Sequence, residues 1–178
     1  MNTLTLLDTT GGPVALSSLW RERPVVLVFV RHFGCLFCRE QVAEVRTHAA
    51  EFQAAGVEVV VVGNGSIVEA AAFATEYAGP LRVLTDPTRE AYCAFGMQRG
   101  WRTAANVGTV SRAVRALARG YRQAARPQGD PLQQGGVLVF ETGGRERWRF
   151  ISKEAGEHPP IEAVIAALPK VDAALKTA

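Results

Sequence analysis

The chain has few cysteines and histidines and no long hydrophobic run. Of its 178 residues, three are cysteine and three are histidine. Its longest apolar runs contain about six residues, whereas a membrane-spanning helix needs about 18 or more. The first residues lack a basic stretch followed by an apolar core, so we expect no signal peptide and no membrane anchor. The sequence therefore predicts a cytoplasmic protein in a reducing compartment, where permanent disulfides are rare.

Residues that bind metals are scarce as well. A structural zinc ion takes about four ligands, usually cysteine or histidine. Cys35 and Cys38 form a Cys-x-x-Cys pair, and the other residues of these types are scattered along the chain. These are His32, His48, Cys93 and His158. Because none of them is paired at a ligand spacing, we expect neither a metal site nor a metal or organic cofactor.

Acidic residues are absent from a long segment in the second half of the chain. From Arg99 to Arg126 the sequence contains seven arginines and no acidic residue, so this segment carries a charge of +7. Because the net charge of the chain is +3, the remaining residues together carry −4. We interpret the arginines as a solvated helix face, with an anionic substrate head-group or an acidic partner as the alternatives. No aromatic stacking pattern accompanies the charge, so we expect no nucleic-acid partner.

Strand-like and helix-like segments alternate in the first half of the chain. Short runs rich in β-branched residues, typical of buried strands, occur at 25–31, 57–62 and 81–84. A segment with helical signals follows each of them. The predicted helices cover 38–54, 66–77 and 86–96. This order predicts parallel strands joined by helical crossovers.

The second half of the chain predicts a different arrangement. A strand at 136–140 turns into an alternating strand at 145–151, which is typical of an antiparallel hairpin at a sheet edge. A closing helix follows Pro160, and residues 99–131 form a helical insertion. We therefore predict a single α/β domain over residues 1–178 with a thioredoxin-like fold, in which helices flank a central mixed sheet.

The pair Cys35 and Cys38 is the strongest chemical signal in the sequence. It lies between the strand at 25–31 and the helix at 38–54, so Cys38 falls in or near the first helical turn. Unpaired amides at a helix N-terminus favour an anion and can lower a cysteine pKa from about 8.5 to roughly 3.5–7.5. A second thiol nearby can then close a disulfide with the oxidised sulfur. The pattern indicates a redox-active dithiol, with two inert buried cysteines or half of a zinc site as the alternatives.

Three basic residues flank the pair, namely Arg31, His32 and Arg39. We interpret Arg31 as a group that stabilises the thiolate, with a surface salt bridge as the alternative. His32 is either a catalytic acid or base, or a partly exposed turn residue. For Arg39 we expect a solvated side chain.

In these residues the chain resembles the alkyl hydroperoxide reductase/thiol-specific antioxidant (AhpC/TSA) superfamily, and within it the peroxiredoxin-like proteins with a Cys-x-x-Cys motif. The similarity extends roughly from Leu4 to Leu168. Its most specific parts are Val28–Glu40, Thr85–Tyr92 and Gln134–Phe140. The resemblance implies a thiol-dependent antioxidant enzyme that reduces hydrogen peroxide or organic hydroperoxides and is itself reduced by a thioredoxin- or glutathione-like donor.

The resemblance also implies roles for individual residues. The peroxidatic cysteine of the family falls on Cys38, and Cys35 stands where the family has threonine or serine. Cys38 would therefore attack the peroxide, and Cys35 would resolve the oxidised product. Family members bring an arginine to the thiolate at the position of Gln134, and Arg31 can supply that charge here. Arg31, His32 and Gln134 are therefore the candidate residues for stabilising the thiolate or the substrate.

Several alternatives stay open. In thioredoxin-like enzymes the first cysteine of the motif attacks, so Cys35 and Cys38 can exchange roles. The protein can instead be a protein thiol-disulfide oxidoreductase, a lipid endoperoxide reductase or a non-catalytic binding module of thioredoxin fold. Cys93, in an apolar stretch, is interpreted as an inert core residue, or else as a remote resolving thiol. A homodimer is possible.

Overall fold

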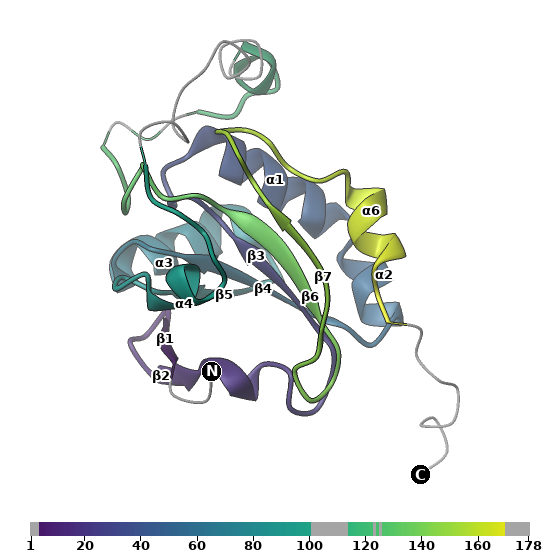
Figure 1. Cartoon of the computed structure of the whole chain (residues 1–178). Coiled ribbons are helices and arrows are strands. Elements are labelled where there is room, and N and C mark those ends of the chain that lie inside the picture. The colour runs from purple at the N-terminus through teal and green to yellow at the C-terminus, as the bar shows by residue number, and fades with distance from the viewer. Residues whose placement is uncertain (1–3, 101–113, 123, 125, 170–178) are drawn as a thin grey trace.

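The computed structural model describes residues 4–100, 114–122, 124 and 126–169, and one seven-stranded sheet organises them (Figure 1). Its strands are β1 (Thr5–Asp8), β2 (Pro13–Ala15), β3 (Val25–Phe29), β4 (Glu58–Gly63), β5 (Arg82–Thr85), β6 (Gly136–Phe140) and β7 (Glu146–Ile151). The helical elements are η1 (Leu16–Ser18), α1 (Leu36–Thr47), α2 (Ala49–Ala54), α3 (Ile67–Phe73), η2 (Ala74–Ala78), α4 (Glu90–Ala94) and α6 (Ile161–Ala166).

The strands follow the order β2-β1-β5-β4-β3-β6-β7. β3, β4 and β5 are parallel, and β6 runs antiparallel to β3 on the other side. β7 pairs antiparallel with β6 and forms one edge of the sheet. The predicted mixed sheet with an antiparallel edge hairpin is therefore confirmed.

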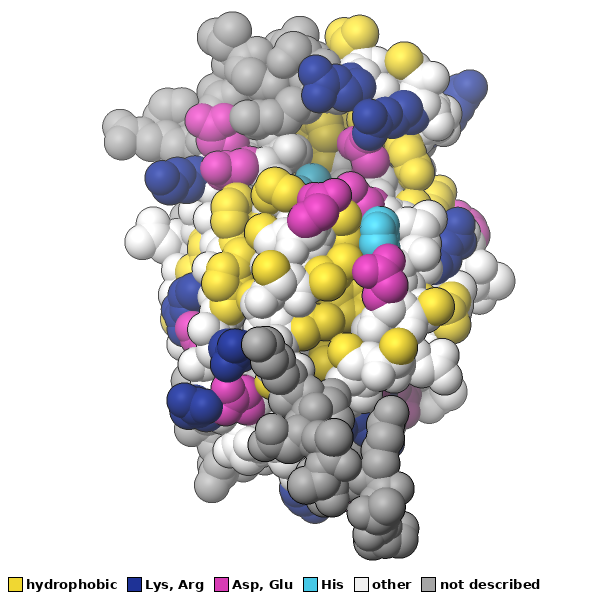
Figure 2. All heavy atoms as spheres, turned by 90° about the vertical axis from the view of Figure 1, so that its right-hand side faces the viewer, with side chains coloured by type: hydrophobic (Ala, Val, Ile, Leu, Met, Phe, Trp, Pro, Cys, Tyr) yellow, Lys and Arg dark blue, Asp and Glu magenta, His cyan; other side chains and the backbone are white. Residues whose placement is uncertain are grey.

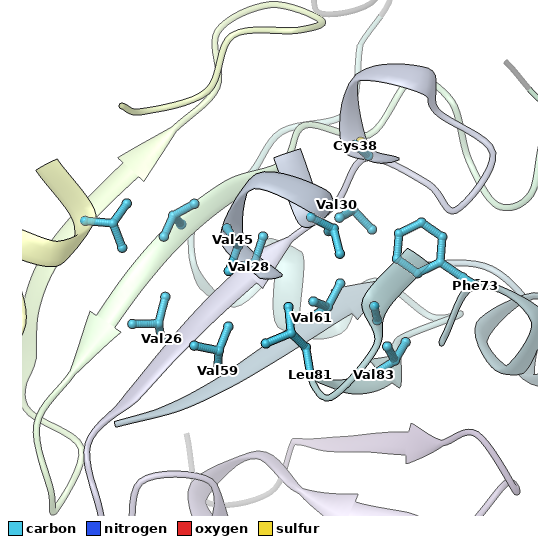
Figure 3. Close-up of a cluster of buried hydrophobic side chains, with 14 of the residues drawn as sticks. Val26, Val28, Val30, Cys38, Val45, Val59, Val61, Phe73, Leu81 and Val83 are labelled. Carbon is cyan, nitrogen blue, oxygen red and sulfur yellow. The ribbon is translucent and has the colours of Figure 1, made fainter. Parts of the chain in front are cut away.

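Both faces of the central strand β3 are buried, which explains why its sequence is apolar without alternation. Val26 and Val28 point into a cluster with side chains from α1, α2, α3 and α6. Figure 3 shows this cluster, with Cys38 at its upper end beside Val30. Leu27 and Phe29 point to the opposite face, which side chains from η1 and α4 cover. The end of β3 is thus fixed from both sides, and the chain leaves the sheet there to form the turn that carries both cysteines.

The helix boundaries differ from the prediction at two places. The predicted helix 38–54 is divided at His48, where the backbone leaves helical geometry (φ −100°, ψ 11°). The helix predicted from residue 86 begins only at Glu90, because Arg89 before it has φ 62°, which interrupts a right-handed helix. α3 begins with a capping box, in which Ser66 and Glu69 hydrogen-bond each other's backbone amides.

Only part of the predicted helical insertion falls among the described residues. Residues 114–118 are helical, with Ala116 buried and with Val114 and Leu117 exposed by 63% and 54%. Arg119 pairs with Glu40 of α1 at 2.6 Å. The face over α1, α2 and α6 shows basic side chains at its upper end, beside exposed hydrophobic ones (Figure 2). Within the described part of the chain, no helix is long and apolar enough to cross a membrane.

Candidate active site

The two cysteines occupy the start of α1. Cys35 is the N-cap residue, with extended backbone angles (φ −74°, ψ 122°), and Cys38 lies in the first helical turn. The predicted placement of the pair on a strand-to-helix turn is confirmed. Because the first amides of a helix have no partner within the helix, this is a position where a negative charge is stabilised.

Both thiols are reduced and buried, Cys35 with 4% and Cys38 with 1% of its surface exposed. The last part of the insertion, at residues 124 and 126–128, covers the turn. The amide of Phe33 donates to the carbonyl of Gln128, and the amide of Ala124 donates to the carbonyl of Gly34, both at 3.0 Å. These contacts hold the segment against the turn, in which both sulfurs are nearly inaccessible to solvent.

The negative charge of the pair is favoured on Cys35. A hydrogen bond from the Cys38 thiol lowers the pKa of Cys35 to about 7, and the backbone amides of Cys38 and Phe37 and the Arg31 charge act in the same direction against burial. Burial raises the pKa of Cys38 well above its usual value, and the hydrogen bond and charge of Cys35 raise it further. The sequence led us to expect a lowered pKa at Cys38. The direction at Cys38 therefore differs from that expectation, because burial and the neighbouring Cys35 outweigh the Arg31 amide that donates to the Cys38 sulfur.

Arg31 is held beside the thiols by two carbonyl groups. Its Nε donates to the carbonyl of Gln133 at 3.1 Å, and its Nη2 donates to the carbonyl of Pro131 at 2.6 Å. Its backbone amide donates to the Cys38 sulfur at 3.3 Å. The guanidinium is buried, with no carboxylate within 4 Å among the described residues, and it favours the thiolate of both cysteines. These contacts support the predicted role of Arg31 in stabilising the thiolate.

The other two predicted stabilising residues are placed differently. His32 is buried, and burial, with the charges of Arg31 and Arg39, lowers its pKa to about 4, so its ring is neutral at pH 7. The side-chain oxygen of Gln134 accepts a hydrogen bond from the amide of Gln98 at 2.7 Å, so it is engaged there and not with the thiols. The residue before it, Gln133, is the one that contacts Arg31.

Sequence reasoning missed a network of polar residues behind the turn, of which Asn64 is buried. Asn64 donates to the carbonyl of Arg31 and accepts the amide of Asp130, both at 2.7 Å. Asp130 in turn pairs with Arg89 at 2.6 Å and with Arg99. This network fixes the segment whose carbonyls hold Arg31. The sequence offered only a weak signal for it, the turn-forming stretch around Asp130.

Tyr92 links the ends of two neighbouring strands. Its hydroxyl lies 2.7 Å from the carbonyl of Val30 and 2.9 Å from that of Val62, and its side chain is fully buried. Burial raises the pKa of Tyr92 well above its usual value, and Asp86 and Cys38 add to the shift. The hydroxyl is therefore a fixed neutral donor that holds the strand end from which the catalytic turn starts.

Two expectations for single residues are corrected. Cys93 is exposed, whereas the sequence suggested a core position; the buried face of α4 is formed by Ala91 and Tyr92 instead. Arg39 is buried rather than solvated, with 8% of its surface exposed. Among the described residues, no three histidine, cysteine or acidic side chains are close enough together to hold a metal ion.

The chain is similar to known proteins over nearly its whole length. Residues 44–154 match the family model described as AhpC/TSA antioxidant enzyme. The matched part of the chain begins after the two cysteines. Peroxiredoxin-like 2C of Bos taurus is 33% identical over 91% of this chain and 75% of that protein. The chloroplastic thioredoxin-like protein AAED1 of Arabidopsis thaliana is 31% identical, over 94% and 71% of the two chains. The prostamide/prostaglandin F synthase of Danio rerio is 33% identical, over 90% and 81%.

Solved structures show the same fold at lower identity. Peroxidoxin BcpB of Mycobacterium tuberculosis superimposes with a TM-score of 0.67 at 20% identity, covering 96% of this chain and 94% of that one. Peroxiredoxin Q of Xanthomonas campestris has the same TM-score at 15% identity, with 94% and 90% covered. These matches confirm the predicted thioredoxin-like fold.

Proposed function

The chain belongs to the AhpC/TSA antioxidant enzyme family, as its resemblance implied, and we propose that Cys35 and Cys38 are its redox pair, with Cys35 as the attacking thiolate. The protein is a thiol-dependent antioxidant oxidoreductase of peroxiredoxin type. Its oxidised substrate is a peroxide, and its reductant is a thiol. The structure adds a physical basis for the order in which the two sulfurs react.

The first step uses the ionised sulfur. The Cys35 thiolate attacks one oxygen of the peroxide, and the O–O bond breaks as an S–O bond forms. The sulfur is oxidised to a sulfenic acid, and the other oxygen leaves as an alcohol or water after it takes up a proton. The positive charge of Arg31 beside the pair stabilises the anion before attack and the charge that builds up on the leaving oxygen.

The second step uses Cys38. Its sulfur attacks the sulfenic sulfur of Cys35, the S–O bond breaks, and water leaves as the disulfide forms. An external thiol, thioredoxin- or glutathione-like, then reduces the disulfide and restores both sulfurs. No metal or organic group takes part in this sequence of steps.

The single observation that carries this order is the position of Cys35 at the helix N-cap. The hydrogen bond shared with Cys38 and the amides of Cys38 and Phe37 lower the pKa of Cys35 to about 7 there. About half of such a thiol is ionised at neutral pH, which combines a useful thiolate population with good nucleophilicity. Cys38 is less exposed and stays protonated. The assignment exchanges the roles that the family motif implied.

Single-turnover experiments test the order. Cys93→Ser removes the exposed third thiol from the background of both variants. We expect Cys38→Ser to consume about one equivalent of peroxide and to form a sulfenic acid at Cys35 that mass spectrometry detects after trapping with dimedone. We expect Cys35→Ser to consume almost none. The opposite pattern would return the attacking role to Cys38, and loss of consumption in both variants would remove the sulfenic intermediate from the mechanism.

A second candidate substrate is a lipid endoperoxide, since relatives named prostamide/prostaglandin F synthase cover most of the chain. The same two sulfurs suffice for it. Attack of Cys35 on one ring oxygen opens the O–O bond and leaves one hydroxyl, and attack of Cys38 releases the other as the disulfide forms. Formation of one diol for each Cys35–Cys38 disulfide would support this activity, and turnover of hydroperoxides alone would refute it.

A further inference from the structure

Two buried guanidinium groups, those of Arg31 and Arg39, lie near the dithiol. Arg31 and Arg39 are exposed by 5% and 8%. The charge of Arg31 favours the thiolate of both cysteines and is used in the mechanism above. That mechanism leaves Arg39 without a task, although a buried cation is costly unless it is paired.

Arg39 lacks an anionic partner. None of the described carboxylates lies within 4 Å of its nitrogens. Its Nη1 donates to the carbonyl of Arg122 at 2.7 Å, and its guanidinium carbon lies 4.6 Å from the centre of the Tyr77 ring. Its Nε is buried and has no hydrogen-bond acceptor among the described residues. The Arg122 carbonyl thus satisfies one side of the group and leaves the Nε edge, the edge with which a carboxylate pairs, without an acceptor.

The position of Arg39 fits a role in binding a reactant. It lies four residues after Cys35, so both point to the same side of the helix start, and its amide donates to the Cys35 carbonyl at 3.1 Å. His32 lies close enough to Arg31 and Arg39 to feel both charges, and its Nδ1 is likewise buried with no partner among the described residues. Residues 122 and 124 contact Arg39 and Gly34, so one cover closes over both the guanidinium and the catalytic turn.

We propose that Arg39, with His32 beside it, binds the carboxylate of a small molecule that reacts with the dithiol. This proposal rests on the proposed function and names the class of reactant that the site prefers. The carboxylate accepts from the Nε edge of Arg39 while the reactive group of the same molecule meets Cys35. Such a carboxylate has two sources, a peroxide that carries an acid group or a reducing thiol such as glutathione, which carries two.

Matched pairs of reactants separate the two sources. The oxidising arm compares a fatty acid hydroperoxide with its methyl ester, and the reducing arm compares glutathione with its diethyl ester. Each pair is measured with the unchanged protein and with Arg39→Met. Arg46→Met is the control, because Arg46 is an exposed arginine two turns further along α1 that also contacts Tyr77, through the carbonyl oxygen of that residue.

We expect the unchanged protein and the Arg46 variant to prefer the acid over its ester in at least one arm. In Arg39→Met the ratio of the two kcat/KM values should fall about tenfold, the size expected for loss of a hydrogen bond between charged groups. The arm in which the ratio falls identifies the source of the carboxylate. An unchanged ratio in both arms, with acid and ester slowed equally, would give Arg39 a purely structural role and overturn the proposal.

A binding measurement separates this proposal from the proposed function. Octanoate is titrated calorimetrically into Cys35→Ser and into the double variant that also carries Arg39→Met, so that no turnover is needed. Binding by the first protein that weakens about tenfold or more in the second supports the carboxylate site, even if every peroxide proves a poor substrate. Equal binding of octanoate by both proteins refutes the carboxylate site. The site is also refuted if Cys35→Ser does not bind octanoate and neither kinetic arm shows a preference for the acid over its ester.

Discussion

Cys38→Ala should raise the pKa of Cys35, because the Cys38 thiol is the largest cause of its lowered value. A hydrogen bond to a charged group contributes roughly 1.5–3 kcal/mol, and one pKa unit corresponds to about 1.4 kcal/mol. Loss of this donor should therefore move the pKa upward from about 7 by on the order of one to two units. Cys38→Ser keeps a hydroxyl donor of similar size at the same place. It should leave the pKa close to that of the unchanged protein.

The assay follows the midpoint of ionisation rather than a rate at one pH. A thiol with a higher pKa is ionised less but is more nucleophilic once ionised, so alkylation rates at a single pH partly cancel the effect. We propose thiolate absorbance and iodoacetamide alkylation as functions of pH, both with Cys93→Ser to remove the exposed thiol. Equal midpoints for the alanine and serine variants and the unchanged protein would refute the shared hydrogen bond. The amides and Arg31 would then be sufficient to ionise Cys35.

Three other substitutions test separate parts of the site. Tyr92→Phe removes the hydroxyl donor from the buried carbonyls of Val30 and Val62, the second of which keeps the amide of Val30 as a donor. Urea denaturation should therefore show a loss of about 1–3 kcal/mol, with Tyr77→Phe as a control that changes little. Because the pKa of His32 is lowered from 6.5 to about 4, its ring takes up a proton more readily in the unfolded chain. The unfolding free energy should therefore fall by up to about 3 kcal/mol as the pH drops from 6.5 to about 4. His32→Gln should make the unfolding free energy less dependent on pH in this range. A Cβ at Gly135 would lie 2.5 Å from the carbonyl oxygen of Phe29, so Gly135→Ala should destabilise the protein by about 2 kcal/mol or more, whereas Gly100→Ala has open space and should not. An unfolding free energy of the unchanged protein that does not depend on pH between 6.5 and about 4 would contradict the neutral state of His32. Unchanged stability of Tyr92→Phe or of Gly135→Ala would contradict the roles given to those two residues.

The sequence predicted well those features that depend on local patterns. The unbroken apolar run of β3 marked a strand buried on both faces, and the helical spacing after Cys38 marked α1. The Gly135-Gly136 pair drew attention as part of a motif, and the structure gives its reason: a Cβ at either position would lie 2.5 Å from a carbonyl oxygen of a neighbouring strand end. Short-range sequence patterns were thus sufficient to predict the fold and the location of the two cysteines.

The electrostatics of the site were beyond the reach of such patterns. The carbonyls that hold Arg31 come from residues 100 and 102 positions away, and the Asn64 contact spans 33 positions. Arg39 was expected in solvent because nothing near it in sequence shows that the chain returns at residue 122 to cover it. For Cys93, the helical face depends on where α4 begins, and the left-handed backbone of Arg89 shifts that start. The last two errors concern contacts or backbone angles that periodicity does not encode.

The proposed order of the two chemical steps rests on the way the sulfurs share one charge. While Cys35 is a thiolate, burial and the negative charge of its neighbour keep Cys38 protonated. Conversion of Cys35 to a sulfenic acid removes that charge and also the acceptor of the Cys38 proton. Burial still opposes ionisation of Cys38, but the amide of Arg31 at 3.3 Å and its guanidinium favour the thiolate and now act alone. In the proposed order, the resolving thiol therefore becomes more reactive once the first step has removed the charge of Cys35.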